Sequence, residues 1–225
     1  MDLTKDAKPV TGGKEAGACL PATPEESFVK ALYASVDEAI ACGLDRLLKD
    51  DGIVPSCRLG CCSCCRFPIL ISIAEARTLA HFVKRTFSLE QIESLRIRTR
   101  QWHQWDDALR AGSFSHDTAG LTKPSSRKMS CPILVDEACS AYDVRPLVCR
   151  SHFVRSHPLS CKEADNTQSV GNPPRVIESV KAATQSYTTS MKDYVEKTGL
   201  DYCRTMTLLP HGLAAEMGWD FDKAQ

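Results

Sequence analysis

The chain has 225 residues, of which 43% are hydrophobic and 25% are charged, and 28 Lys and Arg residues balance 28 Asp and Glu residues. This composition is typical of a soluble globular protein and excludes a small scaffold that depends on disulfides for a core. Nucleic-acid-binding proteins usually have an excess of basic residues, so the balanced charge gives no evidence for a nucleic-acid partner. No apolar run is long enough for a membrane span, so no membrane partner is expected.

The N-terminal segment predicts a mobile tail over residues 1–22, followed by a single domain over residues 23–225. The tail is rich in Gly, Lys, Thr and Ala, and it lacks the apolar stretch of a signal peptide. The expected compartment is therefore the cytoplasm, where disulfides are rare. Twelve cysteines in a cytoplasmic chain indicate metal binding before they indicate disulfides.

The first expected helix starts at Pro24 and is ended by Gly52. Thr23 is its N-cap candidate, and Glu26 is expected to complete a capping box. Apolar residues then recur at helical spacing along the segment. Cys42 falls within this helix, where we expect a buried and unreactive thiol.

The rest of the chain predicts further helices and no strong strand. Capping-box sequences open the second and third helices, and alternating hydrophobicity is absent. The expected helices fall within residues 72–86, 88–112, 175–199 and 208–221, and residues 112–130 are expected to form a loop. The sequence therefore predicts a mainly-α fold, in which a helical frame carries two irregular cysteine-rich metal-binding segments.

The first cysteine-rich segment, CRLGCCSCC, covers residues 57–65 and contains five cysteines. The second covers residues 131–161 and contains four cysteines together with three prolines that disfavour long helices. Soft thiolates select zinc, Cu(I) or iron–sulfur centres. The short Cys61-x2-Cys64 spacing lets one loop place two sulfurs on one ion. We expect both segments to join in one metal centre or in two adjoining ones.

Some cysteines and histidines leave alternatives open. Neighbouring side chains usually diverge, so Cys64 and Cys65 either face two metal positions or divide into one ligand and one packed thiol. His152 and His157 could replace a cysteine as ligand, although a satisfied or exposed histidine is the simpler interpretation. Three cysteines lie outside the two segments and are expected to be non-ligands: Cys19, Cys42 and Cys203.

The order of motifs around the cysteines resembles a known family. CRLGCCSCC is followed by Glu75–Ala76 and then by CPILVDEACSAYDVRPLVCRSH, which is similar to the CxxCxxCC cysteine-cluster proteins, the YkgJ-like family described as zinc- or iron-chelating. The resemblance covers residues 57–161, and it departs from the family pattern in a longer first gap and in the extra Cys62. It implies eight metal ligands: Cys57, Cys61, Cys64, Cys65, Cys131, Cys139, Cys149 and Cys161.

Basic residues accompany the cysteines. A metal held by four thiolates is a net anion, and a nearby guanidinium lowers the pKa of a thiol. Arg145 could instead pair with Asp143 or Asp136 in a turn, and each arginine could simply be a solvated surface residue. The flanking arginines are Arg58, Arg66, Arg145, Arg150 and Arg155.

The expected function is metal binding in the cytoplasm, by an iron–sulfur cluster or zinc held between the two segments, with a chelation or redox role. An iron–sulfur-dependent modification enzyme is the first alternative. The cysteine spacing of residues 57–64 matches that of radical S-adenosylmethionine enzymes, but Ser63 stands where those enzymes carry an aromatic residue. Flagellin lysine methylases carry a similar cluster in longer chains, but no Gly-rich signature for a methyl donor occurs here.

A helical adaptor with purely structural zinc is the second alternative, with Trp102 and Trp105 as candidates for its docking surface. Core packing is the simpler interpretation for at least one of these tryptophans. The sequence identifies no catalytic residue, substrate or protein partner. All-cysteine ligation and flanking cations suit both metals, and between the two we expect an iron–sulfur centre by a small margin.

Overall fold

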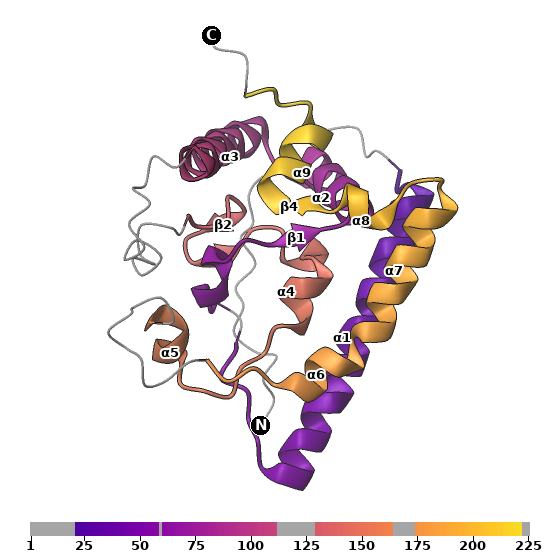
Figure 1. Ribbon diagram of the computed structural model, residues 1–225, viewed down its shortest axis with the longest axis vertical. Coiled ribbons are helices and arrows are strands. Elements are labelled where there is room, and N and C mark those ends of the chain that lie inside the picture. The colour runs from indigo at the N-terminus through magenta and orange to yellow at the C-terminus, as the bar shows by residue number, and fades with distance from the viewer. Residues whose placement is uncertain (1–20, 59, 112–128, 164–173, 222–225) are drawn as a thin grey trace.

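The computed structural model describes residues 21–58, 60–111, 129–163 and 174–221, and these residues form a mainly helical fold (Figure 1). The α-helices are α1 (Pro24–Asp51), α2 (Ile73–Thr86), α3 (Leu89–Arg110), α4 (Leu147–Ser151), α5 (Pro158–Glu163), α6 (Glu178–Ala183), α7 (Gln185–Lys197), α8 (Tyr202–Thr205) and α9 (Leu209–Met217). The helical content confirms the mainly-α prediction. Most of the predicted tail (residues 1–22) and of the predicted loop (residues 112–130) lies outside the described residues, which include only residues 21–22 and 129–130 of them.

Short elements connect these helices. Two 3-10 helices, η1 (Ser63–Arg66) and η4 (Tyr142–Val144), lie in the cysteine-rich segments. The strands are β1 (Leu70–Ile71), β2 (Leu134–Val135), β3 (Ala138–Cys139) and β4 (Thr207–Leu208). β1 pairs antiparallel with β4, and β2 pairs antiparallel with β3. Strands this short give no alternating hydrophobic pattern, which is why the sequence did not predict them.

Helix α1 begins and ends at the predicted residues. The Glu26 N–H donates to Thr23 Oγ1 at 3.0 Å, and Gly52 ends the helix in the left-handed region with φ of 63°. The capping box predicted for Glu26 is only half formed. Its buried carboxylate forms ion pairs with Lys30 and with two residues of α2. The Glu26 side chain therefore forms tertiary ion pairs instead of the local capping hydrogen bond.

The other capping signals predict their helices correctly. Both reciprocal hydrogen bonds of the box are present at Ser72 in α2 and at Ser88 in α3. The helix expected within residues 175–199 is instead two helices, α6 and α7. They are separated at Thr184, whose hydroxyl donates to the Lys181 carbonyl at 2.8 Å. Such a side-chain bond competes with the helical backbone ladder.

The prediction that Cys42 is buried is wrong, because its side chain is exposed on α1. The buried residues of this helix include Val29, Val36 and Ile40. Cys42 follows Ile40 by two positions, which turns it about 200° away from that buried face. The exposed Cys203 is also remote from the two cysteine-rich segments in sequence.

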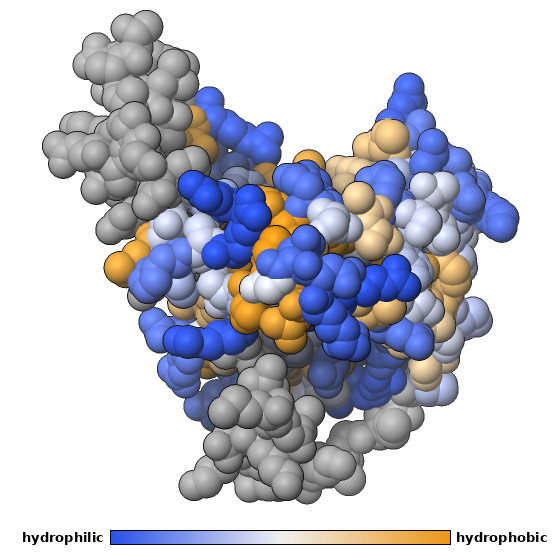
Figure 2. All heavy atoms as spheres, turned by 90° about the horizontal axis from the view of Figure 1, so that it is seen from below, coloured by the Kyte–Doolittle hydropathy of each residue, from blue (hydrophilic) through white to orange (hydrophobic). Residues whose placement is uncertain are grey.

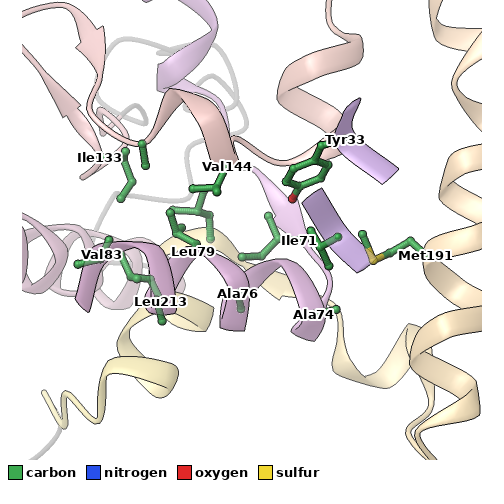
Figure 3. Close-up of a cluster of buried hydrophobic side chains, with 14 of the residues drawn as sticks. Tyr33, Ile71, Ala74, Ala76, Leu79, Val83, Ile133, Val144, Met191 and Leu213 are labelled. Atoms are coloured by element: carbon green, nitrogen blue, oxygen red, sulfur yellow. The ribbon is translucent and has the colours of Figure 1, made fainter. Parts of the chain in front are cut away.

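The larger hydrophobic core lies among α1, α2 and α9 (Figure 3). Leu79 and Val83 of α2 and Leu213 of α9 belong to this core, and all three side chains are almost fully buried. Ile133 and Val144, from the second cysteine-rich segment, belong to the same cluster. The irregular segment is therefore packed against the helical core, and the core fixes where its cysteines lie.

A smaller core joins α1 to α6 through Val36, Ile40, Ile177 and Val180. Helix α7 then continues alongside α1 (Figure 1). Apolar atoms also reach the surface on the face seen from below, within a hydrophilic border (Figure 2). None of the helices in the described ranges combines the length and apolar character that a bilayer span requires.

Candidate metal centre

A cavity of about 450 Å³ lies where the two cysteine-rich segments meet. Seven of the eight predicted ligands line it: Cys57, Cys61, Cys64, Cys65, Cys131, Cys139 and Cys149. The eighth, Cys161, lines a second cavity of about 20 Å³ together with Cys57, Cys61 and Cys64. The two cavities adjoin, because these last three cysteines line both of them. The fold thus brings the two segments together, as the sequence led us to expect.

The first segment is wound into a compact turn that directs several thiols to one side. Gly60 adopts φ of 83°, a conformation that favours glycine, and the Cys61 N–H donates to the Arg58 carbonyl at 3.0 Å. The 3-10 helix η1 follows and carries Cys64 and Cys65. The extra Cys62 precedes η1 as its N-cap and lines neither cavity.

The second segment is attached to the first by its backbone. The Cys131 N–H donates to the Cys65 carbonyl at 2.7 Å. A two-residue turn then follows, with positive φ at Asp136 and Glu137, and it joins β2 to β3. Cys139 lies on β3 and lines the larger cavity, as Cys131 does. The hairpin therefore returns the chain so that two cysteines eight positions apart reach one cavity.

Helix α4 brings Cys149 to the larger cavity, and a buried carboxylate holds the start of that helix. Oε1 of Glu75 accepts a hydrogen bond from the Leu147 N–H at 2.8 Å and another from the Tyr33 hydroxyl at 3.3 Å. Oε2 accepts from the N–H and the hydroxyl of Ser72, each at 2.9 Å. One carboxylate thus links α1, α2 and α4.

Arg150 anchors the same helix from its other side. Its Nε donates to the Arg145 carbonyl at 2.8 Å, and its Nη2 donates to the Asp143 carbonyl at 2.5 Å. The guanidinium also pairs with Asp37 and lies 4.2 Å from the centre of the Tyr33 ring. Arg150 is buried, so the interpretation as a solvated surface arginine is wrong for this residue.

A separate set of contacts joins the start of the first segment, at Cys57, to the chain that leads to Cys161. The Ser56 N–H donates to the Val154 carbonyl at 2.9 Å, and the Val154 N–H donates to Cys57 Sγ at 3.3 Å. Helix α5, which carries the buried Cys161, packs against η1. These contacts place Cys57 and Cys161 on the smaller cavity.

One cation faces the larger cavity from the second segment. The Arg145 guanidinium lies 4.0 Å from the centre of the Tyr142 ring, and Arg145 lines the cavity. Its Nε is buried and makes no hydrogen bond within the described ranges. Neither Asp143 nor Asp136 forms an ion pair with it in this part of the chain, so that predicted pairing is wrong. Arg58 also lines the cavity but is exposed.

Burial shapes the protonation of the thiols. It raises the pKa of Cys131 to about 12 and the pKa of Cys149 well above its ordinary value. Burial also raises the pKa values of Cys57 and Cys139. A buried thiol favours its neutral form, whereas a bound cation favours the thiolate. A cation that bound to these thiols would therefore have to displace their protons.

Cys64 and Cys65 behave as a pair. A hydrogen bond from the Cys65 thiol is the main reason that the pKa of Cys64 is lowered, and the same bond raises the pKa of Cys65. Cys64 lines both cavities, and its charge raises the pKa of Cys57 and of Cys149.

The thiols line open cavities, and their sulfur atoms do not converge on one common point. Among the described residues, no three or more His, Cys, Asp or Glu side chains have the arrangement of a finished metal site. His152 lines both cavities and could contribute a nitrogen ligand. His157 is exposed, and its Nδ1 accepts a hydrogen bond from the Leu159 N–H at 3.2 Å, which favours the interpretation as an exposed histidine.

Sequence reasoning missed the supporting roles of Glu75 and Arg150. Glu75 was noted as a capping residue of α2 and as part of the motif order, and Arg150 as one flanking arginine among five. The contact of Glu75 with α4 joins residues 72 positions apart, and the contact of Arg150 in α4 with Asp37 in α1 joins residues 113 positions apart. The motif order that includes Glu75–Ala76 is the one signal that could have pointed to a role at the cysteine cluster.

Comparison of the chain with protein-family models, curated proteins and solved structures gave no match. The similarity to the YkgJ-like proteins therefore stays a prediction that depends on the cysteine motifs. The class of site is defined by its own residues, which are thiols from two segments around two adjoining cavities.

Proposed function

We propose that this protein binds metal through its eight clustered cysteines, as an iron–sulfur or zinc protein with a chelation or redox role. The observation that carries the proposal is the convergence of all eight thiols on two adjoining cavities. Two segments that are separated by α2 and α3 contribute four thiols each. Chance clustering does not account for this arrangement, and soft thiolates select zinc, Cu(I) and iron–sulfur centres.

The size of the larger cavity favours a polynuclear centre there. Four thiolates around a single zinc ion lie about 2.3 Å from it and leave no space between them. An iron–sulfur cluster instead places several iron and sulfide ions between its thiolates. A cavity of about 450 Å³ with cysteines on its wall has room for the second arrangement. When bound, such a cluster would supply one-electron redox chemistry.

Residues of the chain would contribute to the centre in separate ways. Cys65, Cys131, Cys139 and Cys149 line only the larger cavity and would supply its thiolates. Arg145 would offset part of their negative charge, because its guanidinium lines the same cavity. Apolar side chains such as Phe67 and Ile133 complete the wall and would limit the access of water.

The alternatives have less support. Radical S-adenosylmethionine enzymes need a β/α barrel, and the strands in the described residues are only two residues long. For an adaptor, Trp102 is buried and Trp105 is half-buried, so core packing accounts for Trp102. Neither observation points to a substrate or to a protein partner.

Purification without oxygen, followed by analysis of iron, sulfide and zinc, tests the proposal. We expect metal to copurify with the full-length chain, with a brown colour if the larger cavity holds an iron–sulfur cluster. Replacement of Cys131 by serine is expected to lower the metal content, whereas replacement of the exposed Cys203 is not. A chain that binds no iron or zinc, even after reconstitution without oxygen, would refute metal binding.

A further inference from the structure

The eight thiols line two cavities of very different size, and three of them line both. The smaller cavity, of about 20 Å³, has room for about one water-sized sphere, and therefore for one ion. The larger cavity has a volume of about 450 Å³. Four cysteines line the smaller cavity (Cys57, Cys61, Cys64 and Cys161), which leaves four others to line the larger cavity alone.

The smaller group has the parts of a tetrahedral four-sulfur site. Cys61 and Cys64 are the Cys-x2-Cys pair of one tight turn, Cys57 precedes them in the same segment, and Cys161 approaches from α5. Zinc with four thiolates needs such a set of sulfurs from short loops. The described sulfurs have not closed onto a point, but rotation about the Cα–Cβ bond of each cysteine moves its sulfur between staggered positions.

The hydrogen bonds that hold Cys57 differ from those that hold α4. The Val154 N–H donates to Cys57 Sγ at 3.3 Å, a bond that favours a charged sulfur and fixes its direction. The hydroxyl of Ser56 donates to the Val154 and Ser156 carbonyls and so holds the two chain segments together. By contrast, the hydrogen bonds of Glu75 and Arg150 support α4 and its Cys149.

We infer that Cys57, Cys61, Cys64 and Cys161 form a separate single-ion zinc site beside the polynuclear centre held by Cys65, Cys131, Cys139 and Cys149. The inference rests on the proposed metal-binding function and extends it. Cys64 and Cys65 then serve two neighbouring sites, which is the arrangement that adjacent, diverging side chains allow. The protein would carry two metals of different kinds, each in a cavity of matching size.

Two matched variants test the partition, each removing a sulfur that lines one cavity only. Zinc, iron and sulfide are measured in the full chain purified without oxygen. Cys161→Ser is expected to lower the zinc content at least about tenfold and to keep iron and sulfide. Cys139→Ser is expected to lower the iron and sulfide content and to keep the zinc. If both variants lose the same metal to the same degree, the two-site inference is wrong while metal binding stands.

A measurement on the unmutated chain guards against a variant that fails to fold. Cobalt(II) in a four-thiolate site gives the strong visible bands of tetrahedral coordination. After removal of zinc, one equivalent of cobalt(II) is expected to produce these bands without any loss of iron or sulfide. Displacement of iron by cobalt would overturn the separate zinc site. A chain that binds neither zinc nor iron would refute the proposed function itself.

Discussion

The Glu75 carboxylate accepts a hydrogen bond from the Leu147 N–H, and the two atoms are 2.8 Å apart although the residues are 72 positions apart. The same side chain completes the capping box of α2 and accepts a hydrogen bond from Tyr33. A local helix-start signal therefore also holds the helix that carries Cys149 against the core.

Replacement of Glu75 by alanine is expected to destabilise the protein by about 2–4 kcal/mol, because a cap is lost and several buried donors are left without a partner. Denaturant unfolding measures the change. Gln91→Ala is the matched control, since it removes the same reciprocal capping bond from α3 at an exposed site. It is expected to cost less than about 1 kcal/mol. Equal effects would mean that Glu75 acts only as a local cap.

Gly212 marks the closest approach of α9 to its neighbours. A Cβ atom added there would lie 2.7 Å from Thr207 Cγ2 and 3.1 Å from Ala76 Cβ. Neither neighbour has a flexible side chain that could move away. Gly212→Ala is therefore expected to lower the free energy of unfolding by about 1–3 kcal/mol.

Gly43 in α1 has free space where Gly212 in α9 has close neighbours. A Cβ atom at this position in α1 would meet nothing within 4 Å. Gly43→Ala should stabilise the protein by about 0.5–1 kcal/mol, because alanine loses less backbone entropy in a helix. Thermal unfolding of both variants checks the pair. A neutral Gly212→Ala would contradict the packing of α9 described here.

The lowered pKa of Glu26 predicts how the stability of the fold depends on pH. Although burial would raise its pKa, hydrogen bonding and charge from Lys30, together with the charges of Arg85 and His81, hold the pKa of Glu26 below its ordinary value of 4.5. A carboxylate with a lowered folded-state pKa stabilises the fold above its unfolded-state pKa. That contribution is lost as the pH falls through the folded-state pKa.

Glu26→Gln is therefore expected to destabilise the protein at neutral pH by about 2–4 kcal/mol, since three basic groups lose their charged partner. The difference from the unmutated chain should narrow as the pH falls below 4.5. Urea unfolding at a series of pH values measures it. Glu93→Gln, at an exposed ion pair with Arg96, is the control and should change little. A difference that stays constant with pH would rule out this linkage.

Cys62 is predicted to be a bystander and Cys64 a ligand. Cys62 lines neither cavity, whereas Cys64 lines both. Cys62→Ser is expected to keep the full metal content, and Cys64→Ser to lower it at least about tenfold, by analogy with the loss of one supporting group. Metal analysis of the two purified variants decides between them. Loss of metal in Cys62→Ser, with retention in Cys61→Ser, would show that the ligand assignment is shifted by one residue.

The sequence by itself determined the local structure wherever a signal is confined to a few residues. Thr23, Ser72 and Ser88 begin helices because each side chain accepts from a backbone N–H three positions later. Gly52 ends α1 because a residue without Cβ enters the left-handed region readily. The grouping of thiols in two short segments likewise follows from the spacing of cysteines along the chain.

Only the tertiary structure decided how these local pieces are used. Glu26 pairs with basic residues of α2 and does not complete its capping box. Cys42 is exposed because it lies on the face of α1 opposite the buried residues. The division of the thiols between two cavities depends on α5 packing against η1 and on Glu75 holding α4. Such contacts join residues that are far apart in the chain, and no periodicity or short motif encodes a distance in space. For this reason the sequence predicted which cysteines gather, and packing determined which of them face the same cavity.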